Sequence, residues 1–103
     1  MAAAPDFALS AATRVTAVKD QVSCEIDREA VILHLKSGVY YGLNEVGARV
    51  WALVQQARRV SEIESAIAGE FDVSPEQCAA DVRGLLEQFH AAGLIEVVAE
   101  RTA

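Results

Sequence analysis

Two cysteines and two histidines are the side chains of this sequence best suited to act as a nucleophile or a general base near neutral pH. Cys24 and His34 lie in strand-like segments, whereas Cys78 and His90 lie in a segment with helical spacing. A Cys24–His34 dyad across neighbouring strands would be the enzymatic interpretation. Spacing fixes no nucleophile beside either histidine. We therefore expect no enzymatic activity and no catalytic residue.

Motifs that bind metals or phosphates are missing from the sequence. A metal site needs three or four ligands, and neither an HxxxH nor a CxxC spacing occurs. Glu62 and Glu64 belong to a predicted helix start, where the helix dipole accounts for acidic residues. The glycines of Gly38–Gly42 have the wrong spacing for a phosphate loop. We expect no metal and no cofactor.

The two cysteines are far apart in the sequence, which is typical of free thiols in a reducing cytosol. A disulfide between them is the alternative. The segment Met1–Asp6 lacks the positive charge and the continuous apolar run of a signal peptide. No apolar run approaches the roughly 18 residues that a bilayer span needs. These features predict a cytoplasmic protein.

Length and charge narrow the class of protein further. The chain has 103 residues, of which 52% are hydrophobic and 23% are charged, as in one ordinary globular domain. The net charge is -6, and the residues from 60 onward hold nine acidic but only two basic side chains. Such a surface repels phosphate backbones and anionic lipids. We expect neither nucleic acid nor a membrane as a partner.

Alternating and apolar segments predict strands in the first half of the chain. Residues 14–18 and 22–27 alternate, and the second of these segments has an apolar face. That face is formed by Val22, Cys24 and Ile26. Residues 30–35 and 39–43 are predicted to form a hairpin around the three-residue turn Lys36–Gly38. This register pairs Leu35 with Val39, Leu33 with Tyr41, and Val31 with Leu43, all on one face.

The second half changes to helical spacing and carries capping signals. Asn44 is a suitable N-cap for a helix to about residue 56, and Ser61–Glu64 is a capping box for a second, short helix. Ser74–Gln77 is another capping box, for a helix that runs to about residue 91. Gly93 ends this helix, and residues 94–98 form a short extended tail.

These elements predict an α+β fold that resembles a winged helix-turn-helix, with an N-terminal three-stranded antiparallel sheet followed by three helices. We expect the folded domain at residues 14–98, with flexible segments at 1–13 and 99–103. The third helix holds three acidic residues against the single Arg83, which disfavours binding in a DNA groove. A winged-helix regulator that acts through protein or weak DNA contacts stays the alternative function.

The strand at residues 39–43 is the most informative surface feature. In a meander it lies at the sheet edge, and it carries neither the proline nor the charge that usually blocks pairing with another chain. Such an edge can accept an extended peptide, with the third helix as a second wall. The alternative is a covered strand and helical residues that are all core. Tyr40 is then an ordinary hairpin aromatic and Asp81 a solvated charge.

Two separated motifs resemble the PqqD-like family. VILHLKSGVYYGLNEVGARVW, residues 31–51, is similar to that family's hydrophobic strand, glycine turn, YYxLN and GxxIW pattern. DVRGLLEQF at residues 81–89, followed by GLI at 93–95, resembles the last helix of that family and the GLI segment that follows it. The resemblance covers about residues 14–98.

The resemblance implies a RiPP recognition element, which binds the leader segment of a ribosomally made precursor peptide as an added strand. The domain then presents the precursor to a leader protease and cyclase, as in lasso-peptide synthesis, or to a radical SAM enzyme. Carried over by motif, the peptide-binding residues are Val39, Tyr40, Tyr41, Gly42, Leu43, Asp81, Val82, Leu85 and Phe89.

Overall fold

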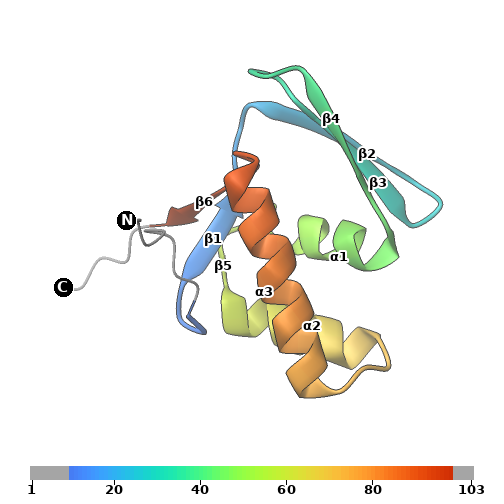
Figure 1. Cartoon of the computed structure of the whole chain (residues 1–103), viewed down its shortest axis with the longest axis vertical. Coiled ribbons are helices and arrows are strands. Elements are labelled where there is room, and N and C mark those ends of the chain that lie inside the picture. Colours follow the sequence, from blue (N-terminus) through green and yellow to red (C-terminus); the bar gives the residue numbers. More distant parts are fainter. Residues whose placement is uncertain (1–9, 99–103) are drawn as a thin grey trace.

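Two small antiparallel sheets and three helices make up the part of the chain that the computed structural model describes, residues 10–98 (Figure 1). The segments 1–9 and 99–103, which we expected to be flexible, lie outside the described residues. Residues 10–13 belong to the described part, and they are hydrogen-bonded to a helix start: Thr13 O accepts from Val60 N (2.8 Å) and Ala11 O from Ser61 N (3.0 Å). We therefore propose that the folded domain begins before residue 14.

The larger sheet is the predicted antiparallel meander. It contains β2 (Gln21–Ile26), β3 (Glu29–His34) and β4 (Val39–Leu43) in that order. The turn between β2 and β3 is formed by Asp27 and Arg28, both with positive φ, as a tight two-residue hairpin requires. The fold class, a three-stranded sheet with three helices behind it, is confirmed.

The predicted register of the β3–β4 hairpin is wrong by one residue. His34 pairs with Val39 and Ile32 with Tyr41, so the turn has four residues, 35–38, instead of three. The turn is closed locally, because Gly38 N donates to His34 O (2.7 Å) and the His34 ring contacts the Ser37 hydroxyl (2.9 Å). Leu35 N donates instead to Asp20 O (3.0 Å), which takes Leu35 out of the ladder.

This shift changes which side of the sheet is buried. Ala30 and Ile32 face the helices and are buried, whereas Val22 and Ile26, which we expected on a buried face, are exposed. The reason is that helix α1 packs against the Ala30–Ile32 side, where Trp51 Nε1 donates to Ser23 Oγ (3.1 Å). A sheet with apolar residues on both sides does not reveal its inner face by alternation.

A second sheet was not predicted. It joins β1 (Arg14–Ala17) to the two-residue β5 (Arg58–Arg59) on one side and to β6 (Ile95–Val98) on the other. The expected extended tail is therefore a strand, paired from Ala17↔Ile95 to Arg14↔Val98. These pairings connect the two ends of the domain.

The three helices are α1 (Glu45–Leu53), α2 (Val60–Glu70) and α3 (Pro75–Ala91). Two predicted N-caps are confirmed, since Asn44 Oδ1 accepts from Gly47 N (2.9 Å) and Ser74 Oγ from Gln77 N (3.2 Å). The capping box predicted at Ser61–Glu64 is wrong by two residues, because the N-cap of α2 is Arg59 and Glu62 Oε1 accepts from Arg59 N (2.9 Å). None of the described helices is long and apolar enough to cross a membrane.

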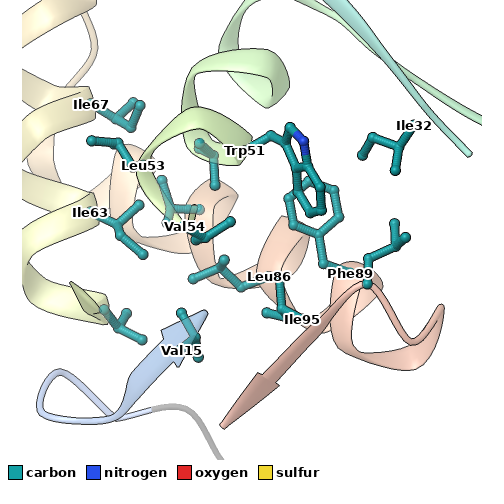
Figure 2. Close-up of a cluster of buried hydrophobic side chains, with 14 of the residues drawn as sticks. Val15, Ile32, Trp51, Leu53, Val54, Ile63, Ile67, Leu86, Phe89 and Ile95 are labelled. Atoms are coloured by element: carbon teal, nitrogen blue, oxygen red, sulfur yellow. The ribbon is translucent and has the colours of Figure 1, made fainter. Parts of the chain in front are cut away.

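One hydrophobic core joins both sheets and all three helices (Figure 2). Within this core, the rings of Trp51 and Phe89 meet edge to face with centroids 5.5 Å apart. Two ion pairs connect the helices outside the core. Arg49 on α1 donates to Glu70 on α2 (2.7 Å), which lowers the pKa of the Glu70 carboxyl, and Arg83 on α3 donates to Glu64 (2.8 Å).

The two cysteines are both free thiols, in different environments. Cys24 is exposed on β2, whereas Cys78 is buried on α3 with its Sγ 3.5 Å from Glu64 O. Burial raises the pKa of the Cys78 thiol, and the charges of Glu64 and Asp81 raise it further. Both effects keep Cys78 in its unreactive thiol form.

We therefore expect a thiol reagent such as DTNB to modify one cysteine per native chain at pH 8 and the second only after unfolding. The Cys24→Ser variant should show no rapid reaction at all. The reaction is followed by absorbance with and without denaturant. Rapid modification of the native Cys24→Ser variant would contradict the buried position of Cys78.

Candidate peptide-binding groove

The free edge of β4 is the first component of the site. Strand β4 pairs with β3 along one side, and no other strand within residues 10–98 pairs with its second side. Alternate backbone N–H and C=O groups of such an edge lack a ladder partner. The strand contains no proline and no charged residue. It is therefore open to pairing with an extended chain.

A hollow of about 360 Å³ separates this edge from helix α3. Its lining is mostly apolar and comes from two distant parts of the sequence. The lining residues are Tyr40, Tyr41, Gly42, Leu43, Leu85, Gln88, Phe89, Ala92 and Leu94. We call this hollow, together with the β4 edge, the groove. It offers backbone hydrogen bonds on one wall and an apolar surface on the other.

Six of the nine residues predicted from the sequence line the groove, namely Tyr40, Tyr41, Gly42, Leu43, Leu85 and Phe89. Val39 is exposed at the start of β4, outside the lining. Asp81 is exposed one helical turn before Leu85, and its Oδ1 accepts from Gln77 Nε2 (2.9 Å). Val82 is buried in the core and is not among the residues that line the groove.

Three lining residues were missed. Gln88 and Ala92 follow Leu85 at helical spacing, so the spacing of α3 could have indicated them. Leu94 lies beyond the helix, and no pattern in the sequence places it beside β4. Its position depends on the end of α3, where Leu94 N donates to Phe89 O (2.9 Å) and Gly93 adopts a φ of 77°.

The floor of the groove is part of the core. Phe89 is 3% exposed and Leu94 is 1% exposed, and the Phe89 ring rests against Trp51 (Figure 2). His34 lies against Gly93, where an added Cβ would be 3.4 Å from His34 Nε2. This contact holds the end of β3 against the end of α3. Both walls are thus fixed to the same packed interior.

The reactive side chains considered in the sequence do not form a catalytic group. Cys24 pairs with Val31 and His34 with Gln21, and the odd spacing between Val31 and His34 places the two side chains on opposite faces of the sheet. A Cys24–His34 dyad is therefore not formed. Within residues 10–98, no three histidine, cysteine or acidic side chains are grouped to hold a metal ion.

An open strand edge beside the apolar face of a helix defines a small α+β domain suited to binding an extended segment. A family model described as coenzyme PQQ synthesis protein D (PqqD) matches residues 29–95. The chain belongs to the PqqD family. No curated protein matches this chain.

Three solved structures share its fold. The first is described as TbiB1 in complex with the TbiA(beta) leader peptide. Its sequence is 36% identical, the match covers 82% of this chain and 99% of the TbiB1 chain, and the TM-score is 0.75. A lasso peptide synthetase B1 complexed with the leader peptide is 17% identical over 80% of this chain and 96% of its own, with a TM-score of 0.70.

The third structure is the PqqD truncation of Methylobacterium extorquens PqqCD, described as a functional and stand-alone RiPP recognition element. It is 19% identical, covers 86% of this chain and 95% of its own, and has a TM-score of 0.70. At below 25% identity, this structure and the lasso synthetase support the fold alone. The TbiB1 relative supports membership of the family as well.

Proposed function

We propose that this protein is a non-catalytic adaptor that binds the leader segment of a ribosomally synthesised precursor peptide. The open edge of β4 opposite the apolar face of α3 is the observation that carries this proposal. The leader adds to β4 as a further strand, with its backbone hydrogen-bonded to the free edge. Every second leader side chain then points toward α3 and enters the groove.

The structural relatives support the same ligand. The 36% identical TbiB1 is described in complex with a leader peptide. As the enzymes that receive the precursor we propose a leader protease and cyclase, with a radical SAM enzyme as the next choice. The exposed acidic residues of α3, Glu76, Asp81 and Glu87, do not favour a DNA-binding regulator.

The test is a titration with a fluorophore-labelled leader from a short precursor reading frame, which we expect beside this chain's gene. We expect saturable binding with a Kd at or below tens of micromolar, about -6 to -8 kcal/mol. Amide hydrogen exchange of residues 39–43 should slow in the complex, because the added strand pairs with their free groups. A scrambled leader is the control. Absence of saturable binding by the intact leader would refute the proposal.

A further inference from the structure

A second hollow lies beside the end of β4 where this strand leads into α1. Its volume is about 400 Å³, and its lining includes Ile26, Asp27, Glu29, Val31, Gly42 and Leu43. We call it the outer hollow. Gly42 and Leu43 also line the groove, so the two hollows adjoin the same stretch of β4.

Most of the lining comes from the side of the β2–β4 sheet that faces away from the helices (Figure 1). Gly42 pairs with Val31, and Ile26 pairs with Glu29. Directly paired residues share one side of a sheet. Ala30, which lies between Glu29 and Val31 on β3, points the other way and is buried. The outer hollow is therefore on the outward side of the β4 edge, whereas the groove is on the side of α3.

We infer that the outer hollow binds the side chain of a lysine or an arginine in the leader. This inference rests on the proposed function, because a strand added to β4 brings leader side chains to both hollows. Successive side chains of a strand point to opposite sides of a sheet. One set enters the groove and the other set passes over the outward side. The basic residue is therefore an odd number of positions away from the leader residues in the groove.

Gly42 leaves the path from the added strand to the outer hollow free. No atom lies within 4 Å of the position that a Gly42 Cβ would occupy. The leader strand would lie about 4.8 Å from β4, and β3 lies about the same distance beyond β4. A side chain that starts opposite Gly42 crosses β4 at this gap and reaches Val31, with Glu29 two residues away on the same side. Only a long side chain covers this distance.

The apolar part of the lining matches the stem of a basic side chain. Ile26 is 59% exposed and Val31 is 37% exposed in the free protein. Lysine and arginine bury their methylene groups along such a surface while their charged ends stay hydrated. The outer hollow is open to solvent at its rim, as this binding mode requires.

The charges of the outer hollow favour a cation. Asp27 and Glu29 contribute two carboxylates, and within residues 10–98 neither of them has an ion-pair partner. The neighbouring Arg28 lies 4.0 Å from Glu45 on α1 instead. A cation accepts both carboxylates as charged hydrogen-bond partners. A wholly apolar side chain would cover the carboxylates without offering them a partner, which is unfavourable.

Removing the two charges without changing the shape of the outer hollow tests the inference. The Asp27→Asn/Glu29→Gln variant should bind the labelled leader about five- to tenfold more weakly at low salt, because ion pairs at a partly exposed site contribute modestly. Asparagine tolerates the positive φ of residue 27 (51°), so the β2–β3 turn is kept.

The matched control is the Asp72→Asn/Glu76→Gln variant. It changes the net charge by the same amount at two exposed residues where α2 leads into α3, away from β4 (Figure 1). This control should bind the leader as the unmodified protein does, which separates a local contact from the general attraction of an acidic protein for a basic peptide.

Replacing each lysine and arginine of the leader in turn by norleucine identifies the bound residue. Norleucine keeps most of the apolar stem and has no charge. One replacement should weaken binding to the unmodified protein by a similar factor. The same replacement should not change binding to the Asp27→Asn/Glu29→Gln variant, because both changes remove the same interaction. Fluorescence anisotropy measures each Kd.

The Gly42→Val variant tests the path to the outer hollow. Valine fits the open space above β4 in the free protein and then stands between the leader and the outer hollow. It should weaken leader binding, and adding Asp27→Asn/Glu29→Gln should cause no further loss. Circular dichroism checks that each variant is folded.

Equal affinity of the Asp27→Asn/Glu29→Gln variant and its control for the leader would overturn the inference and leave the proposed function intact. A leader without any lysine or arginine at the required spacing would do the same. If the unmodified protein does not bind the intact leader at all, the proposed function and the inference are both overturned.

Discussion

Replacing Leu85 by aspartate is expected to weaken leader binding by about 2–4 kcal/mol, roughly 30- to 1,000-fold in Kd. Leu85 lines the groove opposite β4 and is half-buried in the free protein. A leader strand that covers this position would remove the new carboxylate from water without offering it a partner. Burying an unpaired charge is among the most costly changes at an interface. Fluorescence anisotropy with the labelled leader measures the change.

The control for Leu85→Asp is Val97→Asp, the same kind of change at an exposed residue of β6 outside the groove. This variant should bind the leader as the unmodified protein does. Circular dichroism and thermal unfolding of both variants separate loss of binding from loss of folding. A folded Leu85→Asp variant with unchanged affinity would mean that the leader binds elsewhere.

Replacing Trp51 by alanine is expected to lower the free energy of unfolding by about 3–5 kcal/mol. Trp51 is 4% exposed and joins three parts of the domain. Its ring contacts Phe89 under the groove, its Nε1–H donates to Ser23 Oγ on β2, and its backbone belongs to α1. Alanine leaves a cavity and removes both contacts. Since small domains are stable by only about 5–15 kcal/mol, much of the total would be lost.

Urea unfolding followed by circular dichroism measures this change, because the variant has lost the only tryptophan of the chain. Trp51→Phe is the graded comparison; it keeps an aromatic ring beside Phe89 but loses the bond to Ser23, and should cost about 1–2 kcal/mol. A loss below about 1 kcal/mol for Trp51→Ala would contradict the buried, packed position of this ring.

Local signals in the sequence were enough to predict the helices and the exposed strand edge. Asn44 and Ser74 are N-caps as expected, because capping depends on residues within one turn of each other. The small sheet was not predictable in this way. It pairs Arg14 with both Arg59 and Val98, and short strands with distant partners leave little pattern in the sequence.

The limits of the site prediction follow from the shape of α3. Val82 and Leu85 both fit the apolar spacing of this helix, yet Val82 is buried in the core and Leu85 lines the groove. The apolar arc of α3 is wide enough to serve both surfaces. Which residues face the core depends on where α2 and the sheet pack, and this is a property of the tertiary structure.

The backbone hydrogen bonds of the segment that joins the two sheets affect the entropic cost of peptide binding. Val18 N donates to Leu94 O (2.9 Å) and Leu35 N to Asp20 O (3.0 Å), so the segment between β1 and β2 is bonded both to the loop that follows α3 and to the β3–β4 turn. The width of the groove is therefore set before any ligand arrives. A preorganised host loses little conformational entropy on association, so most of the ordering penalty falls on the incoming peptide itself.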